Sequence, residues 1–228
     1  MKKVAILQSN YIPWKGYFDI IGSVDLFIFH DDLQYTKGDW RNRNKIKTAN
    51  GLEWLTIPCG TSEKRLICEV ELKDRSWQKK HWNKISASYR KAPFFKEYEP
   101  LFKDIFLNRE WNNLSEFNQY FIKYISREIL GFETEFDDSR RYNLVSSKAE
   151  RVIELLKKSN ADCYLSGPSA KNYISDNMFL ENDIQIEWMD YSNYPEYNQL
   201  HGEFKHDVSI IDLFFNQGDQ SLNFLKSR

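Results

Sequence analysis

Two acidic residues that could do chemistry, Asp31 and Asp32, follow His30 at the end of the short apolar run at residues 26–29. A carboxylate in such a place can orient an amine, bind a metal or take up a proton from a reacting group. The alternative is that both residues are solvated in a turn or cap a helix. Because successive side chains of a strand point to opposite faces, at most one of the two is expected to be catalytic.

A basic and amide-rich segment, Trp40-Arg41-Asn42-Arg43-Asn44-Lys45, comes shortly afterwards. Arginine presents a fork of donors that matches phosphate oxygens, and asparagine adds further donors. Tyr35 and Trp40 offer flat surfaces for stacking beside them. The segment therefore predicts a diphosphate-binding site, unless it is an exposed loop with ordinary charges.

Two later stretches also carry candidate groups. His81 lies in a segment whose aromatic residues recur at helical spacing, where it could be a general base or simply a packed histidine. The run Ser166-Gly167-Pro168-Ser169-Ala170-Lys171 could form an anion-binding turn at the start of a helix, or an ordinary strand-to-helix loop. Cys163 has no basic partner nearby in the sequence, so a small buried residue is the better interpretation.

The first 48 residues must position the earliest of these groups. Residues 4–7 and 26–30 are apolar and predict two buried strands, and residues 17–22 predict a short helix between them. In a strand–helix–strand unit of this kind, ligands bind at the carboxyl ends of the strands. We therefore expect one site there, on which Asp32, Arg41, Arg43, His81 and Ser166-Gly167 converge.

The rest of the chain alternates strand-like and helix-like patterns. Further strands are expected at 54–58, 66–72, 133–136, 163–167 and 184–188, and helices at 76–91, 97–131 with a break at Asn112-Asn113, 146–158, from 168 onward, and 209–215. This order predicts an α/β fold with a mainly parallel sheet and flanking helices. We expect a single domain over residues 1–228, in which residues 76–131 form a helical insertion or lid.

Net charge, cysteine content and the lack of known motifs exclude several classes of protein. The net charge of -1 and the mixed distribution of charges argue against a nucleic-acid binder. Three cysteines without a CxxC motif, together with the lack of a signal peptide, favour a reducing cytoplasm, and no apolar run reaches the 18 residues of a membrane span. The four histidines show no metal-ligand spacing, and no GxGxxG, GxxxxGK[ST], HExxH or GxSxG motif occurs, so neither a metal nor a bound cofactor is expected.

Segments along nearly the whole chain resemble the WbqC-like family of bacterial proteins. They are Ala5-Ile6-Leu7-Gln8, residues 10–18, Asp31-Asp32-Leu33-Gln34-Tyr35, residues 40–46, residues 54–58, Lys80-His81, residues 164–167, Pro195, Tyr197, Gln199, residues 209–213, Asn216 and Gly218. The resemblance implies a role in O-antigen or other surface-polysaccharide biosynthesis. It implies transfer of an acyl or aminoacyl (glycyl) group to the amine of a nucleotide-linked amino sugar, with a carrier-protein or CoA thioester as donor. The chain departs from the family pattern at Ser9, often Pro, and at Tyr194, often His.

A weaker resemblance concerns the opening strand, loop and helix, which are similar to the start of the nucleotidylyltransferase superfamily. That superfamily carries two histidines in an HxGH pattern, and here Trp14 and Tyr17 stand at those spacings. The resemblance thus implies a related fold without adenylylation through that motif.

Two functions remain open from the sequence. In an N-acyltransferase, Arg41, Arg43 and Lys171 would hold phosphates, and Asp32, Asp31 or His81 would take the proton of the attacking amine. The alternative is a non-catalytic protein that binds a nucleotide-sugar or a partner of the same pathway, and a third possibility is an ATP-dependent ligase. The expected substrate-binding residues are Gln8, Asn10, Tyr11, Trp14, Gln34, Tyr35, Trp40, Arg41, Asn42, Arg43, Ser166, Gly167, Lys171 and Gln199.

Overall fold

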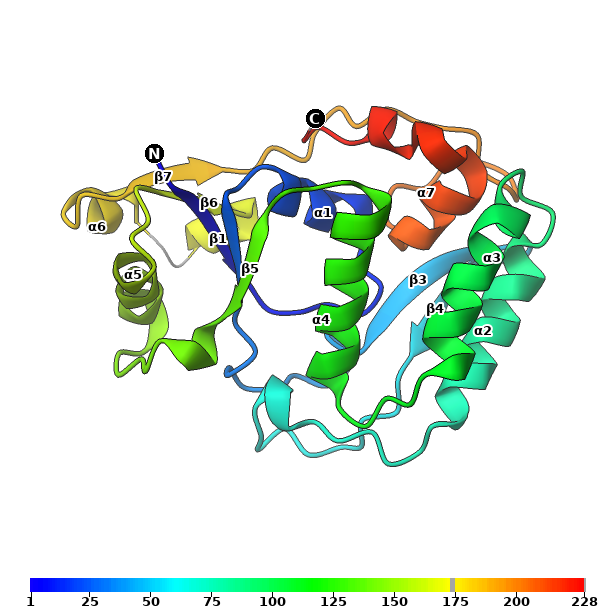
Figure 1. Cartoon of the computed structure of the whole chain (residues 1–228), viewed down its shortest axis with the longest axis horizontal. Helices are drawn as coiled ribbons and strands as arrows, with labels where there is room; N and C mark the ends of the chain where they lie inside the picture. The colour runs from blue at the N-terminus through cyan, green and yellow to red at the C-terminus, as the bar shows by residue number, and fades with distance from the viewer. Residues whose placement is uncertain (173–174, 228) are drawn as a thin grey trace.

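The main feature of the fold is a parallel five-stranded sheet, seen in a computed structural model that describes residues 1–172 and 175–227 (Figure 1). Its strands are β1 (Lys3–Leu7), β2 (Leu26–Phe29), β5 (Glu135–Asp138), β6 (Cys163–Ser166) and β7 (Gln185–Trp188), in the spatial order β5-β2-β1-β6-β7. The chain thus builds outward from β1 through β2 to β5, and then returns to the other side of β1 for β6 and β7. The direction of winding reverses between β1 and β6, and in open α/β sheets this reversal marks the usual ligand crevice.

Alternate residues of the central strands enter two separate cores, which explains why these strands are apolar throughout. Ala5 and Phe27 pack into the core that contains α1 (Lys15–Gly22) and α4 (Leu114–Tyr124). Val4 and Ile28 pack into the core formed with α5 (Lys148–Lys158) and α6 (Asp176–Leu180). The α/β fold with a mainly parallel sheet and flanking helices is confirmed.

Between β2 and β5 the chain forms an antiparallel hairpin and a group of helices, which lie together with α7 on one side of the sheet (Figure 1). These elements are β3 (Arg43–Thr48), β4 (Gly51–Thr56), α2 (Ser76–Tyr89), α3 (Phe95–Lys103), a π-helical turn Asp104–Asn108, α4, a second π-helical turn Ile125–Ile129, and α7 (Ile210–Gln217). The expected break at Asn112-Asn113 is confirmed, because Asn113 caps α4 by accepting a hydrogen bond from the Glu116 amide at 3.1 Å.

Two sequence-based expectations about strands were wrong. Residues 66–72 form a 3-10 turn, Ile67–Glu69, because their apolar side chains anchor a loop to the helices instead of facing a neighbouring strand. The basic segment expected to be a loop contains β3. The expected strand at 54–58 is present as β4, which begins earlier, at Gly51, and pairs with β3 across the turn Ala49-Asn50.

The segment of residues 190–209, called the strap below, joins β7 to α7 without regular structure, and much of it runs along the upper edge of the molecule in Figure 1. Lys47 Nζ donates to Gln199 Oε1 at 2.9 Å and to the Gly202 carbonyl at 3.2 Å. The buried Asp212 accepts hydrogen bonds from the Tyr197 hydroxyl and the Gln199 amide, each at 2.8 Å. These buried contacts fix the strap against the hairpin and α7.

None of the helices in the described ranges combines the length and the apolar character needed to cross a membrane.

Candidate functional site

A cleft of about 360 Å³ lies where the winding of the sheet reverses. The segments that line it are the loop after β1, the turn after β6, the hairpin side and the strap. The lining residues are Asn10, Pro13, Trp14, Trp40, Asn44, Pro168, Ser169, Tyr191, His206 and Asp207. Its volume is within the range of small-molecule sites, and its position is the one expected for a ligand of an open α/β sheet.

The loop after β1 is held in a strained conformation at the edge of this cleft. Ile12 has a φ of 36°, in the left-handed region that β-branched residues rarely adopt. The amide of Asn44 donates to the carbonyls of Tyr11 and Ile12 at 3.1 and 2.9 Å, and the Tyr11 amide donates to the Trp40 carbonyl at 2.9 Å. Strain of this kind persists only where the surroundings enforce it, and it places Pro13 and Trp14 against the cleft.

Trp14 forms a fixed aromatic wall. Its indole folds back over Gly16, so closely that a Cβ at Gly16 would lie 2.3 Å from a ring carbon. On the other side the indole meets the rings of Tyr191 and Tyr194 edge to face, with centroids 5.1 and 5.9 Å apart. The absence of a side chain at Gly16 therefore sets the orientation of Trp14.

His206 lines the cleft together with Tyr191. Burial, with a further contribution from the Lys15 ammonium, lowers the pKa of His206 below its ordinary value. Lys15 is itself enclosed by the Pro195 carbonyl at 3.0 Å and by nearby aromatic rings, and burial lowers the pKa of Lys15 to about 8. At neutral pH the His206 imidazole is therefore uncharged and can accept a proton.

The acidic pair lies elsewhere, and its two residues point to opposite faces of the sheet. Asp31 is fully buried and accepts hydrogen bonds from the Ser9 amide at 2.8 Å and from Gln119 on α4 at 3.1 Å. Asp32 forms an ion pair with Arg151 on α5 and accepts a hydrogen bond from the Ser139 hydroxyl. Neither carboxylate lines the cleft, because each is held by a helix on its own side of the sheet.

His81 is part of the hydrophobic core. Its Nδ1 lies 2.6 Å from the hydroxyl of the fully buried Tyr11, and its ring meets that of Trp77 at 5.4 Å. Burial lowers the pKa of His81 to about 4. His81 and Asp32 therefore do not meet at this cleft, since neither borders it and each already has a buried partner.

The two predicted arginines differ in their surroundings. Arg41 donates to Asn10 Oδ1 at 2.8 Å and to Asp39 at 3.1 Å. Arg41 therefore holds the side chain of Asn10, which lines the cleft, and does not line the cleft itself. The guanidinium of Arg43 lies 4.3 Å from the ring centre of Trp54, and its Nε has no hydrogen-bond partner within residues 1–172 and 175–227. Asn42 is buried and donates to the Ile57 carbonyl at 2.9 Å.

The remaining predicted residues are spread over the fold. Tyr35 is buried, Gln34 is exposed, and the Gln8 carbonyl accepts a hydrogen bond from Tyr17 at 2.9 Å. Gln199 donates a hydrogen bond to Asp212 at 2.8 Å, and the Lys171 ammonium lies 5.1 Å from the centre of the Trp188 ring. The Ser166 hydroxyl donates to the Tyr164 hydroxyl at 3.2 Å. A Cβ at Gly167 would lie 3.7 Å from the Tyr191 hydroxyl.

The structure thus brings three of the predicted residues, Asn10, Trp14 and Trp40, directly into the cleft. Sequence reasoning missed Tyr191, His206 and Asp207, because the strap that carries them has no periodic pattern and is far from β1 in the sequence. Within the described residues, no group of three or more His, Cys, Asp or Glu side chains is disposed to hold a metal ion.

Comparison with known proteins gives the family. Residues 8–224 match the model of the WbqC-like protein family. The chain is 43% identical to the uncharacterized protein Rv1507c of Mycobacterium tuberculosis (strain ATCC 25618 / H37Rv), over 99% of this chain and 98% of that protein. No solved structure matches the chain significantly. The chain therefore belongs to the WbqC-like protein family.

Proposed function

We propose that the protein transfers an acyl or aminoacyl (glycyl) group to the amine of a nucleotide-linked amino sugar, as a step of surface-polysaccharide biosynthesis. The observation that carries this proposal is the cleft at the sheet reversal, which combines aromatic walls with an uncharged histidine. Flat rings suit the apolar faces of a sugar, and a neutral imidazole suits the removal of a proton from an amine.

The proposed reaction needs a thioester as co-reactant, supplied by a carrier protein or CoA. The amine nitrogen attacks the thioester carbonyl, a C–N bond forms and the C–S bond breaks. His206 takes the proton that the amine loses, and the departing thiolate receives a proton to become a thiol. No covalent intermediate with the protein is required.

His206 replaces the acid–base residues expected from the sequence. None of the described residues hydrogen-bonds the His206 imidazole, and the centre of the Phe204 ring lies 4.5 Å from the centre of the imidazole. Asp31, Asp32 and His81, in contrast, are each engaged with buried or half-buried partners. A group that must exchange a proton with substrate needs the access that His206 has.

The test is to incubate the protein with UDP- and dTDP-linked amino sugars and with acetyl or glycyl thioesters of CoA and carrier protein, and to follow the sugar nucleotide by mass spectrometry. We expect a mass gain of one acyl group. His206→Gln should lower kcat by about 10²- to 10⁴-fold, the usual contribution of a general base. The matched control is His201→Gln, on the same strap, where the ring contacts the Ser88 carbonyl at 2.8 Å and does not line the cleft. Absence of product with every donor, or full activity of His206→Gln, would contradict the proposal.

Asp31, Asp32 and His81 are each bound to partners within the fold, so they are not free to act as acids or bases. This observation favours a second candidate function, a non-catalytic protein that binds a nucleotide-sugar. That function predicts binding of the sugar nucleotide by calorimetry, without turnover and without loss of pathway output in His206→Gln. Release of phosphate or pyrophosphate from ATP in the same assays would favour an ATP-dependent ligase instead.

A further inference from the structure

Trp54 and Arg43 of the β3–β4 hairpin lie beside Trp40 of the preceding loop, and both tryptophans are exposed. In the antiparallel register Lys45 stands opposite Trp54, so Arg43, two residues earlier, projects from the same face. Trp54 and Trp40 are each 41% exposed, and their ring centres lie 5.4 Å apart. Trp40, Arg43 and Trp54 are called the tryptophan ledge below.

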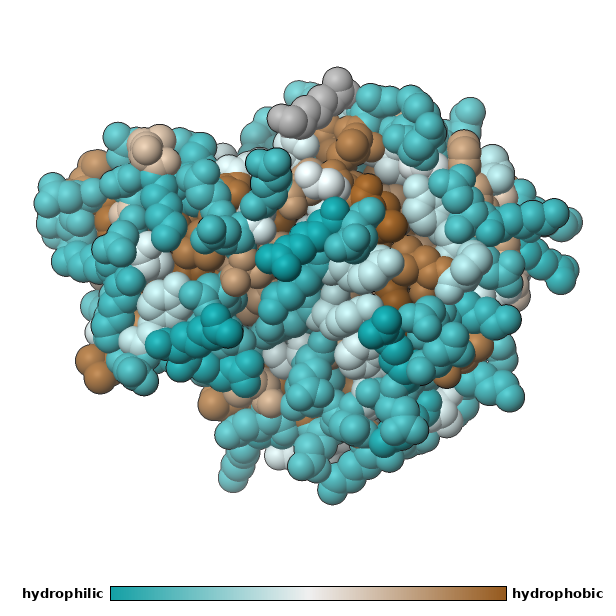
Figure 2. Space-filling model, in the orientation of Figure 1, coloured by the Kyte–Doolittle hydropathy of each residue, from teal (hydrophilic) through white to brown (hydrophobic). Residues whose placement is uncertain are grey.

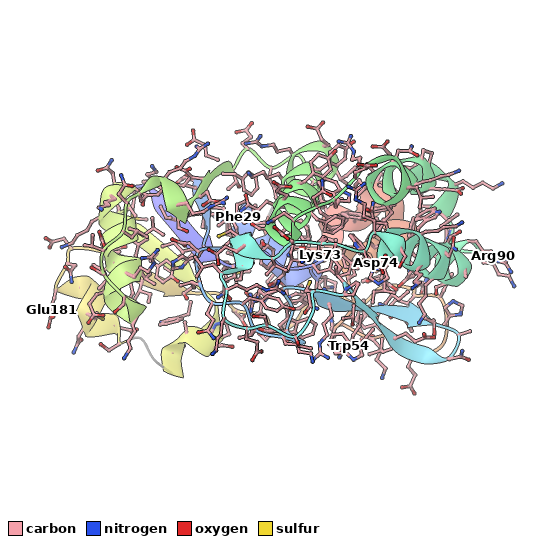
Figure 3. The ribbon with its side chains drawn as sticks, turned by 90° about the horizontal axis from the view of Figure 1, so that it is seen from below. Phe29, Trp54, Lys73, Asp74, Arg90 and Glu181 are labelled. Carbon is pink, nitrogen blue, oxygen red and sulfur yellow. The ribbon has the colours of Figure 1, made fainter. Side chains whose placement is uncertain are left out.

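Trp54 of the ledge and helix α4 lie on different faces of the molecule (Figure 3). The face that carries α4 is mostly hydrophilic, with apolar atoms recessed between polar side chains (Figure 2). Trp54 lies on the other side of the molecule, at the outer margin of the hairpin (Figure 3). Large apolar side chains that are exposed next to each other often mark a binding surface.

Arg43 gives the ledge an uncompensated positive charge. Its neighbours on the hairpin side have acidic partners, Arg41 with Asp39 at 3.1 Å and Lys45 with Asp207 at 2.5 Å. For Arg43, no ion pair is found within residues 1–172 and 175–227, and its Nε is buried without an acceptor. An arginine that stacks on an indole and keeps donors free is suited to a phosphate.

The ledge is continuous with the cleft, because Trp40 belongs to both. A base cannot lie between the two indoles, since 5.4 Å is less than the roughly 7 Å required by two stacking contacts of about 3.5 Å each. It would instead stack on their exposed faces, outside the cleft. A ligand that stacks there reaches the cleft with the part attached through its phosphates.

We propose that the tryptophan ledge binds the nucleoside diphosphate part of the substrate, with the base on Trp40 and Trp54 and a phosphate on Arg43, while the sugar enters the cleft toward His206. This orientation rests on the proposed function for the identity of the sugar. The nucleotide contact itself follows from the ledge. Stacking does not discriminate strongly between bases, so the ledge should accept purine and pyrimidine nucleotides alike.

The test measures binding of UDP, ADP, uridine and pyrophosphate to the full chain by calorimetry. Trp54→Ala should weaken UDP and uridine about 5- to 150-fold, the effect of losing one base stack, and leave pyrophosphate unchanged. Trp54→Phe, which keeps a ring, should retain most of the affinity. The control is Leu180→Ala, which trims a 60% exposed apolar residue on α6.

Arg43→Gln should weaken UDP and pyrophosphate about tenfold or more and leave uridine unchanged. The matched control is Arg90→Gln, which removes the same charge at the end of α2, at the far end of the molecule in Figure 3. Failure of UDP and ADP to bind, or equal effects of Arg43→Gln and Arg90→Gln, would overturn the proposal.

Failure of this inference can be told apart from failure of the proposed function. UDP binding that depends on Trp54, without any acyl transfer, would reject the proposed function and keep the ledge. Acyl transfer with an unchanged KM for the sugar nucleotide in Trp54→Ala would reject the ledge and keep the function. If Trp54→Ala raised only the KM for a carrier protein, and not the KM for the sugar nucleotide, the ledge proposal would also be overturned. The tryptophans would then bind a protein partner.

Discussion

The burial of His81 predicts a specific loss of stability in acid. The pKa of His81 is about 4 in the folded protein, against an ordinary value of 6.5 that we take for the unfolded chain. As the pH falls below about 6.5, the unfolded chain binds a proton at this position and the folded protein does not. Stability is therefore fully present above pH 6.5 and is lost progressively as the pH falls toward 4.

The size of the effect follows from the two pKa values. Their difference corresponds to about 3.4 kcal/mol in total, and the part lost between pH 7.5 and pH 5.0 is about 2 kcal/mol. Domains of this kind are typically stable by about 5–15 kcal/mol, so the change is readily measured. The Tyr11 hydroxyl and Nδ1 of the neutral ring share a hydrogen bond of 2.6 Å, and burial raises the pKa of Tyr11, so the hydroxyl stays protonated.

The assay is urea unfolding of the wild type and of His81→Gln at pH 7.5 and 5.0. Other groups titrate in this range, so the informative quantity is the difference between the two proteins. We expect His81→Gln to be less stable than the wild type at pH 7.5, and to lose about 2 kcal/mol less on going to pH 5.0. Equal losses in the two proteins would refute the assignment of His81 to the core as a buried neutral residue.

Two further predictions concern the packing of Trp14 on α1 and the acidic pair. Gly16→Ala should destabilise the protein by about 1–3 kcal/mol in urea unfolding, because the added Cβ would lie 2.3 Å from the Trp14 ring; unchanged stability would contradict the packing of Trp14 on α1. Asp32→Asn should cost about 2 kcal/mol of stability through loss of the half-buried ion pair with Arg151, while acyl transfer continues at the wild-type rate. Loss of transfer in a folded Asp32→Asn protein would restore Asp32 as a catalytic residue.

Local pattern was enough to predict most of the secondary structure. The apolar runs that became β1, β2, β6 and β7 and the stripes that became α2, α4 and α5 are short-range signals, and each element satisfies its own hydrogen bonds or faces a core in the expected way. The alternation of apolar and charged residues at 66–72 led to the wrong prediction of a strand. A loop anchored by buried side chains shows the same spacing of apolar residues as a half-exposed strand.

The candidate site could be predicted only in part. Asn10, Trp14 and Trp40 were found because they follow β1 or belong to the segment after β2, and the rule that ligands bind at strand ends applies to them directly. Asp31 and Asp32 satisfy the same rule but face α4 and α5, and the sequence does not indicate which helix will cover a strand end.

The sequence by itself determined the class of fold, the family and the expectation of a site at the carboxyl ends of the strands, because strand and helix periodicity and family motifs are properties of neighbouring residues. The tertiary structure alone decided which side chains reach that place. The contacts that decide this join residues far apart in the sequence. Tyr11 binds the buried His81, 70 positions away, and Arg151 pairs with Asp32, 119 positions away. Lys47 binds Gln199 of the strap, 152 positions away. Such contacts form when the chain closes on itself, and no local pattern encodes them.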